Sequence, residues 1–377
     1  MPDTPSFTFG IEEEYHLADL ATRELADVPD ALLADLQHAL GDRVTTEFLR
    51  SQIEVGTRPH SDFNEARDEL AELRGTIAEI AKPYGLAPVA SSTHPLSRRR
   101  DVKQTVNERY DALANDLAGV ARRLVVCGMH VHLGVEDKSL RIDLMNQARY
   151  FIPHLLALTT SSPFWEREDT GLKSFRTIIM DGLPRTGCPN TFESWADYER
   201  TIAVMIDCGV IEDASKIWWD LRPSSNFPTL EMRAMDVCTR LDDAICVAAI
   251  YVCLCRMLYR LREQNLSWRS YPSFLIDENR WRAQRYGVSG SLFDFGKSDL
   301  VPYPDLLDEI IDLVAPDCEA LGCRDAVEHA RTIVSEGTSA DRQRAAFNAC
   351  ADPEAGLVAA ADLVIRETTE TGRGTPA

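Results

Sequence analysis

The sequence predicts an α+β protein built on a mostly antiparallel sheet, and three observations support this fold class. Several stretches alternate apolar and polar residues with a period of two, which is typical of strands that bury one face. Other, longer stretches space Leu, Ile, Val and Ala by three and four, as amphipathic helices do. No Gly-rich crossover follows the predicted strands, so a regular alternation of parallel strands and helices is not expected.

The predicted elements follow one another along nearly the whole chain. The stretches that predict strands are residues 8–17, 45–55, 124–135, 217–222 and 229–236. The stretches with helical period are residues 63–83, 107–124, 139–158, 241–262, 305–314 and 325–335. Asp62 and Ser139 stand where the N-cap residues of two helices are expected. Residues 170–190 are rich in Gly and Pro and are predicted to form a long loop, a kind of segment that is often functional.

Composition and charge exclude several classes of protein. The 377 residues include 40 basic and 60 acidic side chains, a net charge of −20, which disfavours nucleic acid and anionic membranes as partners. The longest apolar run, residues 244–258, is interrupted by Arg256 and is shorter than the ~20 residues of a membrane span. The chain does not open with the pattern of a signal peptide. We therefore expect a cytoplasmic protein.

Cysteine usage and chain organisation agree with that expectation. The ten cysteines show no C-x-x-C spacing, and several lie in apolar helical runs, so we expect reduced and mostly buried thiols. No shift in composition indicates a second domain. We predict a single catalytic domain over residues 1–367, followed by a disordered tail rich in Thr and Gly over residues 368–377.

Two of the predicted strands carry carboxylates or imidazoles on one face. Glu12 and Glu14 share one face of their strand, whereas Glu13 lies on the other. His130 and His132 face one way, and the apolar residues beside them face the other. Paired carboxylates can bind a cation, and histidine is a common metal ligand. Taken singly, these patterns also fit a solvated strand face and hydrogen-bonded core histidines.

Three further strands carry charged residues with related chemistry. Glu231 and Arg233 alternate with apolar residues, which suits a metal ligand beside an arginine clamp for phosphate or carboxylate, although an exposed ion pair gives the same pattern. Arg222 ends the preceding strand. Glu47 and Glu54 are seven residues apart, so a regular strand would place them on opposite faces, and both reach one site only through a bulge or bend.

These candidates together favour Mg²⁺ or Mn²⁺ over zinc, because their donors are mainly carboxylate oxygens and cysteine-rich zinc spacing is absent. The sequence contains neither a P-loop nor a dinucleotide-binding G-x-G-x-x-G motif after a strand, and no Ser or Cys nucleophile motif. A site with two or three cations beside arginines would suit a nucleoside triphosphate.

Seven ordered motifs carry a resemblance to a known family. They are F-G-I-E-E-E, T-x-F-L-R-S-Q-I-E, S-S-T-H-P, N-E-R-Y, G-M-H-V-H-L-G, W-D-L-R-P-S and L-E-M-R-A-M-D. In this order, and over residues 7–365, the sequence resembles the type 2 glutamate-cysteine ligases, also called YbdK-type carboxylate-amine ligases. The resemblance implies a glutamine-synthetase-like catalytic fold, with a curved antiparallel sheet whose outer face is covered by helices.

The resemblance also implies an activity. Glutamate and ATP would form γ-glutamyl phosphate, and the amine of cysteine would displace phosphate to give γ-glutamylcysteine and ADP. Alternatives are the same chemistry with another amine or carboxylate, and a non-catalytic relative that binds glutamate or a nucleotide. The expected partners are therefore small molecules, with ATP as co-substrate and Mg²⁺ or Mn²⁺ as cofactor, and a homo-oligomer stays open.

Residue roles follow from the resemblance position by position. The implied metal ligands are Glu12, Glu14, Glu47, Glu54, His130 and Glu231. Arg222 and Arg233 are implied as the catalytic arginines that bind phosphate or the carboxylates of glutamate. Arg176, in the predicted loop, and His132 are implied in binding ATP or substrate. Glu13 is left out because it faces the other side of its strand.

Overall fold

The computed structural model describes residues 5–105, 107 and 117–372. Its larger strands are β1 (Phe9–Asp19), β2 (Val44–Thr46), β3 (Gln52–Gly56), β4 (Leu86–Val89), β5 (Gly128–Gly134), β10 (Leu221–Pro223) and β11 (Thr229–Asp236). Short paired strands are β6 (Phe164–Trp165), β7 (Glu168–Asp169), β8 (Thr186–Gly187), β9 (Trp218–Trp219), β12 (Ser291–Asp294) and β13 (Asp299–Pro302).

Helices make up most of the remaining described chain. The first group is α1 (Asp30–Leu40), α2 (Phe63–Ala81), α4 (Lys138–Ala148), α5 (Ile152–Thr159), α6 (Phe175–Asp181), α7 (Trp195–Asp207) and α8 (Leu241–Glu263). The second group is α9 (Ser273–Tyr286), α10 (Tyr303–Leu321), α11 (Arg324–Glu328), α12 (Ala330–Glu336), α13 (Ser339–Asn348) and α14 (Pro353–Thr369).

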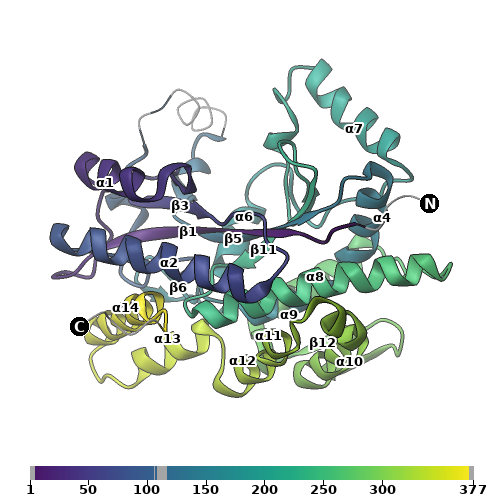
Figure 1. Ribbon diagram of the computed structural model, residues 1–377. Coiled ribbons are helices and arrows are strands. Elements are labelled where there is room, and N and C mark those ends of the chain that lie inside the picture. The colour runs from purple at the N-terminus through teal and green to yellow at the C-terminus, as the bar shows by residue number, and fades with distance from the viewer. Residues whose placement is uncertain (1–4, 106, 108–116, 373–377) are drawn as a thin grey trace.

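Seven of the described strands form one antiparallel sheet. The order is β10–β11–β5–β1–β3–β2, and β4 pairs with the last residues of β1. Helices α2, α5, α8 and α14 pack against this sheet, and helices α10 to α13 lie beyond them, while α1 and α7 rise on the opposite side (Figure 1). The predicted α+β class, with a mostly antiparallel sheet and helices on its outer face, is confirmed.

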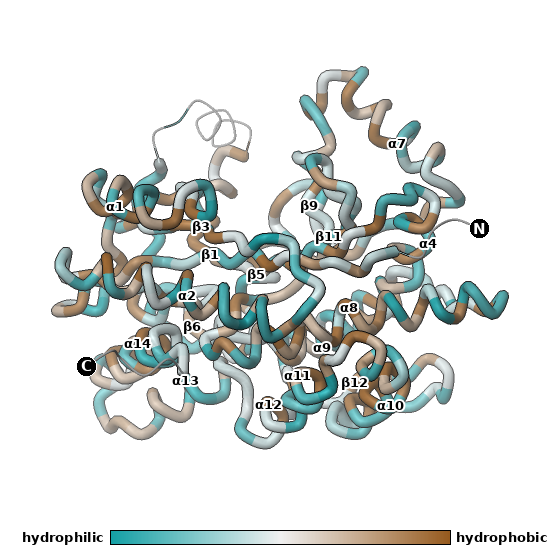
Figure 2. Tube along the Cα trace, viewed as in Figure 1, coloured by the Kyte–Doolittle hydropathy of each residue, from teal (hydrophilic) through white to brown (hydrophobic). Residues whose placement is uncertain are grey.

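Helix α8 forms the centre of the core. Its hydrophobic residues lie where it passes along the sheet, and hydrophilic residues gather at its C-terminal end (Figure 2). Within the described chain, α8 is the one helix whose length and hydropathy would allow it to span a membrane. The sequence alone suggests that the apolar run within it, residues 244–258, is too short for a span. However, 78% of its apolar window is buried inside the protein, as in the core helix of a soluble fold.

Several predicted boundaries are wrong for local reasons. The predicted strand over residues 45–55 is a tight pair, β2 and β3, joined by a short connection. The predicted helix over residues 139–158 is divided into α4 and α5 by a single 3₁₀ turn at Arg149–Phe151. The predicted loop over residues 170–190 contains α6.

Of the two predicted N-cap residues, one is confirmed and one is wrong. Asp62 is the N-cap of α2 as predicted, because its carboxylate accepts hydrogen bonds from two backbone N–H groups of the first turn. Asp137, and not Ser139, is the N-cap of α4. Most of the helix predicted over residues 107–124 and of the N-E-R-Y motif lies outside the described residues. All ten cysteines lie in the described part of the chain as free thiols, and seven are buried.

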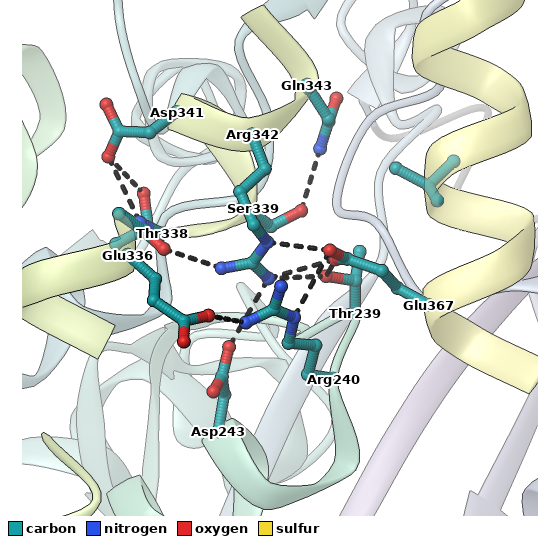
Figure 3. Close-up of polar contacts among 12 residues, drawn as sticks. Thr239, Arg240, Asp243, Glu336, Thr338, Ser339, Asp341, Arg342, Gln343 and Glu367 are labelled. Atoms are coloured by element: carbon teal, nitrogen blue, oxygen red, sulfur yellow. Dashed lines mark hydrogen bonds and ion pairs between the residues drawn. The ribbon is translucent and has the colours of Figure 1, made fainter. Parts of the chain in front are cut away.

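The C-terminal helices are tied to the sheet by a buried polar network. Glu367 of α14 accepts hydrogen bonds from Arg342 of α13 and from Arg240, which lies just before α8 (Figure 3). Thr239, which lies between β11 and α8, also donates to Glu367. Helix α14 therefore continues through Thr368, which is buried, to Thr369, so the predicted disordered tail is wrong over its first residues. Residues 373–377 lie outside the described chain.

Candidate active site

Strand pairing brings the predicted side chains onto one face of the sheet. In the register, Glu12 of β1 pairs with His130 of β5, and Glu14 pairs with Glu54 of β3. On the other side of β5, His132 pairs with Glu231 of β11. Antiparallel partners point to the same face, so segments of four strands that are far apart in sequence form one row of carboxylates and imidazoles.

Glu47 joins this row through the connection between β2 and β3. It follows directly after β2, and Thr45 of that strand pairs with Glu54. The two glutamates therefore meet because the chain reverses between them. Of the two alternatives that the sequence left open, a bulge or a bend, the structure has the bend.

A bulge in β11 adds a second feature that the sequence pattern hides. The register against β5 shifts between Met232 and Met235, so one extra residue is accommodated near Arg233. After the shift, Asp236 pairs with Gly128 and lies on the same face as His130. A regular strand would have placed Asp236 on the apolar face.

Asp236 holds the segment that carries Arg176. Its buried carboxylate accepts hydrogen bonds from the Ser161 N–H (2.9 Å), the Ser162 hydroxyl (2.7 Å) and the Ser174 hydroxyl (2.9 Å). The Arg176 N–H in turn donates to the Ser162 hydroxyl at 3.1 Å. The Arg176 guanidinium donates to the carbonyl oxygen of Arg233 at 3.2 Å, so α6 delivers this arginine to the bulge. Arg176 is thus on a helix, and not in a loop as predicted.

One cavity of about 480 Å³ is lined by all ten predicted site residues. They are Glu12, Glu14, Glu47, Glu54, His130, His132, Arg176, Arg222, Glu231 and Arg233. Six of them form two groups, and within each group the possible metal-ligand atoms lie within 4.8 Å of one another. One group is Glu12, His132 and Glu231, and the other is Glu14, Glu47 and Glu54.

In the first group, neighbouring imidazoles and arginines favour the charged form of the carboxylates. His132 Nε2 lies 3.3 Å from Glu12 and 3.9 Å from Glu231. Although burial alone would raise it, hydrogen bonds with His130 and His132 hold the pKa of Glu12 well below its ordinary value. For Glu231 burial is likewise outweighed, because Arg233 and Arg222 lower its pKa, and Arg222 Nε donates to it at 2.9 Å.

The second group is a cluster of like charges. Burial and the neighbouring Glu47 raise the pKa of Glu14 to about 7, against the lowering effect of Arg176. Burial, together with Glu47 and the other carboxylates, also raises the pKa of Glu54 well above its ordinary value. Without a counter-ion, these side chains therefore tend to take up protons.

His130 occupies a different position from the one that its implied role suggests. Its Nδ1 atom lies 3.3 Å from Glu12 and 3.4 Å from Arg233 Nη1, and burial together with Arg233 lowers its pKa to about 4. His132, and not His130, belongs to the group with Glu12 and Glu231. The buried Nε2 atom of His130 has no hydrogen-bond partner in the described chain, so its role as a metal ligand stays a prediction.

Sequence reasoning missed part of the cavity lining. Gln52, Lys216, Trp218 and a turn over residues 224–227 also line it. Gln52 lies in phase with Glu54 on β3, so its position could have been inferred once that strand was placed. Lys216 and the turn precede and follow β10, and only the folded sheet brings them to the cavity.

The donor set of the two groups fits hard divalent cations. Five carboxylates and one imidazole lie close enough to share cations, and carboxylate oxygens are the donors that Mg²⁺ and Mn²⁺ prefer. Burial and the neighbouring carboxylates raise the pKa values of Glu14 and Glu54, and a bound cation would offset this crowding of negative charge.

Solved structures with low sequence identity share this fold. A glutamate–cysteine ligase from Francisella tularensis, solved in complex with AMP, matches with a TM-score of 0.70 at 14% identity and covers 98% of this chain and 90% of that one. A bifunctional glutathione synthetase from Pasteurella multocida matches with a TM-score of 0.69 at 15% identity, over 97% of this chain and 53% of that one. This chain thus shares the fold of these two ligases, which is built on an antiparallel sheet.

Sequence comparisons define the family. The model of glutamate-cysteine ligase family 2 matches residues 8–361, and the chain belongs to this family. A Rhodospirillum rubrum protein provisionally named glutamate–cysteine ligase 2 is 56% identical over 97% of this chain and 96% of its own length. A Ruegeria pomeroyi protein of the same name is 53% identical over 90% of this chain and 88% of its own. The protein is therefore an ATP-dependent ligase that forms carbon–nitrogen bonds.

Magnesium is expected to stabilise the protein increasingly as pH rises through 7. In the folded protein the pKa of Glu14 is raised from 4.5 to about 7. Protonation of this side chain therefore stabilises the fold fully below about pH 4.5, and this stabilisation is lost as pH rises through 7. A bound cation would replace the proton, so its stabilising effect grows over the same range. Thermal melts with EDTA or Mg²⁺ at about pH 6 and about pH 8 test this, with an ionic-strength control. An equal shift at both pH values would contradict it.

Replacing Gly128 by Ala is expected to displace Arg176. A Cβ atom at this position would lie 2.4 Å from Arg176 Nη2 and 3.0 Å from its Cζ atom. Moving a positioning group by about 1 Å can lower activity by roughly 100-fold, so we expect a loss of that order in kcat/KM for ATP. Gly75→Ala is the matched control, because a Cβ atom there meets nothing within 4 Å. A Gly128→Ala enzyme as active as that control would contradict this role of Arg176.

Proposed function

We propose that this protein joins the γ-carboxylate of glutamate to the amine of cysteine, with Mg²⁺ or Mn²⁺ and ATP. The observation that supports this most directly is that one cavity holds two clusters of carboxylate side chains, flanked by Arg176, Arg222 and Arg233. The names of the two bacterial relatives support the choice of glutamate and cysteine. Because the reaction draws on cellular ATP, we infer that it takes place in the cytoplasm.

The proposed reaction has two chemical steps. The γ-carboxylate oxygen of glutamate attacks the γ-phosphorus of ATP, and ADP leaves, which forms γ-glutamyl phosphate. The amine of cysteine then attacks the acyl carbon, phosphate leaves with the bridging oxygen, and the nitrogen loses a proton. No side-chain nucleophile is needed in either step.

The proposed roles of the side chains follow from their charges. Glu12, His132 and Glu231, and separately Glu14, Glu47 and Glu54, would hold the cations, which supply positive charge against the phosphates. The arginines would stabilise the negative charge that spreads over the transferring phosphoryl group. Arg222 and Arg233 now bind Glu231, so we infer that part of this contact is exchanged for phosphate when ATP enters.

Oxygen-isotope transfer tests the acyl-phosphate route. With glutamate labelled by ¹⁸O in the γ-carboxylate, we expect each released phosphate to contain one labelled oxygen, because the acyl oxygen leaves with phosphate. Mass spectrometry of the phosphate reads this directly. Unlabelled phosphate would contradict the route and indicate attack of water on ATP, and AMP as product would indicate an adenylate.

The same assay distinguishes the amine. Cysteine is compared with a panel of other amino acids and simple amines at equal concentration, with glutamate and ATP constant. We expect the highest kcat/KM for cysteine and a product with the mass of γ-glutamylcysteine. A higher kcat/KM for another amine would overturn the choice of cysteine and leave the ligase chemistry intact.

A further inference from the structure

Three buried cysteines outside the lining of the cavity meet between α8, α10 and the turn before α11. Cys318 lies in the last turn of α10, and Cys323 directly follows the glycine that ends this helix. Gly322 has a φ of 64°, a left-handed conformation that glycine adopts without strain. The turn lets the Cys323 N–H donate to the Cys318 carbonyl at 3.1 Å, so the two side chains fold back toward each other.

Cys253 of α8 completes the group, which we call the cysteine triad (Cys253, Cys318 and Cys323). Its Sγ atom lies 3.4 Å from that of Cys323 and 3.8 Å from that of Cys318, and all three sulfurs lie within 4.8 Å of one another. Each residue is at most 3% exposed. None of the three lines the catalytic cavity.

These separations suit three thiolates around one metal ion. With metal–sulfur bonds of about 2.3 Å, tetrahedral or trigonal geometry places the sulfurs about 3.8–4.0 Å apart, so the Cys253–Cys318 separation already fits and the Cys253–Cys323 separation would widen by about 0.5 Å. A disulfide instead requires about 2.05 Å. We propose that the cysteine triad binds a d¹⁰ metal ion, zinc(II) or copper(I), through three thiolates.

Two electrostatic features beside the triad favour an ion held by thiolates. Next to Cys318, the buried carboxylate of Asp317 is bound by both Arg256 (2.6 Å) and Arg260 (2.8 Å), which leaves one excess positive charge. The end of α10 also presents helix carbonyl groups, whose partial negative charge favours a cation.

The binding step balances without any redox change. The metal ion forms three metal–sulfur bonds, and the triad releases to solvent those thiol protons that it still holds, so affinity rises with pH. Copper(I) is satisfied by three thiolates, whereas zinc(II) needs a fourth ligand from solvent, because no other Cys, His, Asp or Glu of the described chain belongs to this group. A bound ion would link α10 and the turn before α11 to α8.

Metal titration of the full-length, reduced protein tests the proposal under anaerobic conditions. Cobalt(II) is used as a probe for the zinc site, because thiolate coordination gives an intense charge-transfer band that carboxylates and imidazoles do not produce. Zinc(II) is titrated against a chromophoric chelator, and copper(I) is supplied as its bicinchoninate complex. Excess Mg²⁺ is present throughout to occupy the catalytic carboxylates.

We expect one equivalent of zinc(II) or copper(I), a thiolate charge-transfer band, and a higher melting temperature of the metal-bound protein. Cys253→Ser and Cys323→Ser should lose the band, whereas Cys255→Ser, a buried cysteine of the same helix outside the triad, should keep it. In the wild-type protein, the metal should also protect the triad from alkylation, a measurement that needs no variant.

Three results would overturn the proposal. They are absence of a thiolate band with any of these metals, equal binding by wild type and triad variants, and recovery of a disulfide within the triad after acid trapping of the thiols. Ligase activity is not part of the readout, so failure of this proposal and failure of the proposed function are distinguishable.

Discussion

Replacing Glu54 by Gln is expected to abolish ligase turnover and, in the same protein, to stabilise the metal-free fold. Burial together with Glu47, Glu12 and Glu14 raises the pKa of Glu54, so its ionisation is opposed in the absence of a cation. Glutamine keeps the volume and removes that charge. It also removes a proposed cation ligand. The stabilisation of charge in the transition state would then fall by several kcal/mol, which corresponds to a decrease of at least about 100-fold in kcat.

The two effects are measured separately. Phosphate release with ATP, glutamate and cysteine gives the turnover, and thermal melts at about pH 8 in EDTA give the stability. We expect the melting temperature of Glu54→Gln to exceed that of wild type in EDTA and to change little when Mg²⁺ is added. Glu79→Gln, which removes an exposed carboxylate on α2, is the control and should behave like wild type. Wild-type turnover, or a lower melting temperature in EDTA, would contradict the role assigned to Glu54.

The part of the site that depends on strand periodicity could be predicted from the sequence. Side chains alternate strictly along a regular strand, so the shared face of Glu12 and Glu14, and that of His130 and His132, follow from local pattern alone. The class of fold follows similarly, since alternation and helical spacing are local properties. The confirmation of the family by sequence comparison shows that the ordered motifs carried information beyond any one pattern.

The features that escaped prediction depend on backbone irregularity or on contacts distant in sequence. Glu47 and Glu54 meet through a chain reversal that splits one apparent strand. Asp236 reaches the site face because a bulge changes the parity of β11, and nothing in the alternation of that strand marks the extra residue. Arg176 is placed by a helix whose N-cap residue, Ser174, donates a hydrogen bond to Asp236, and the Arg176 N–H donates to Ser162.

The alternation of side chains along β1 predicts which face Glu13 lies on, but not which residues it contacts. The sequence correctly places it away from the cavity, but gives no sign of what it meets there. In the structure its carboxylate is fully buried and accepts two hydrogen bonds from Arg74 of α2, at 2.9 and 2.6 Å. Arg74 also donates to the carbonyl oxygens of Cys238 and Thr239, in the connection between β11 and α8, so this pair joins β1, α2 and the segment that leads into α8.

Glu13→Gln is therefore expected to destabilise the fold strongly and to leave the chemistry of the folded enzyme intact. Removing one partner of a buried ion pair leaves the other charge uncompensated, at about 3–5 kcal/mol of unfolding free energy. The glutamine amide would also direct its N–H groups toward Arg74, which has no lone pair to accept them. Denaturant unfolding should show the loss, while kcat per folded molecule stays within about twofold of wild type, because the side chain points away from the cavity.

A double-mutant cycle separates this interpretation from a general packing defect. With Arg74→Gln added, the uncompensated charge is gone, so the double variant should be less destabilised than the sum of the two single variants. The coupling arises because Glu13 and Arg74 are both fully buried and bind each other directly. Additive losses would show that the pair is not the cause. A kcat for folded Glu13→Gln as low as that of Glu54→Gln would mean that Glu13, and not only its neighbours, acts on the site face of β1.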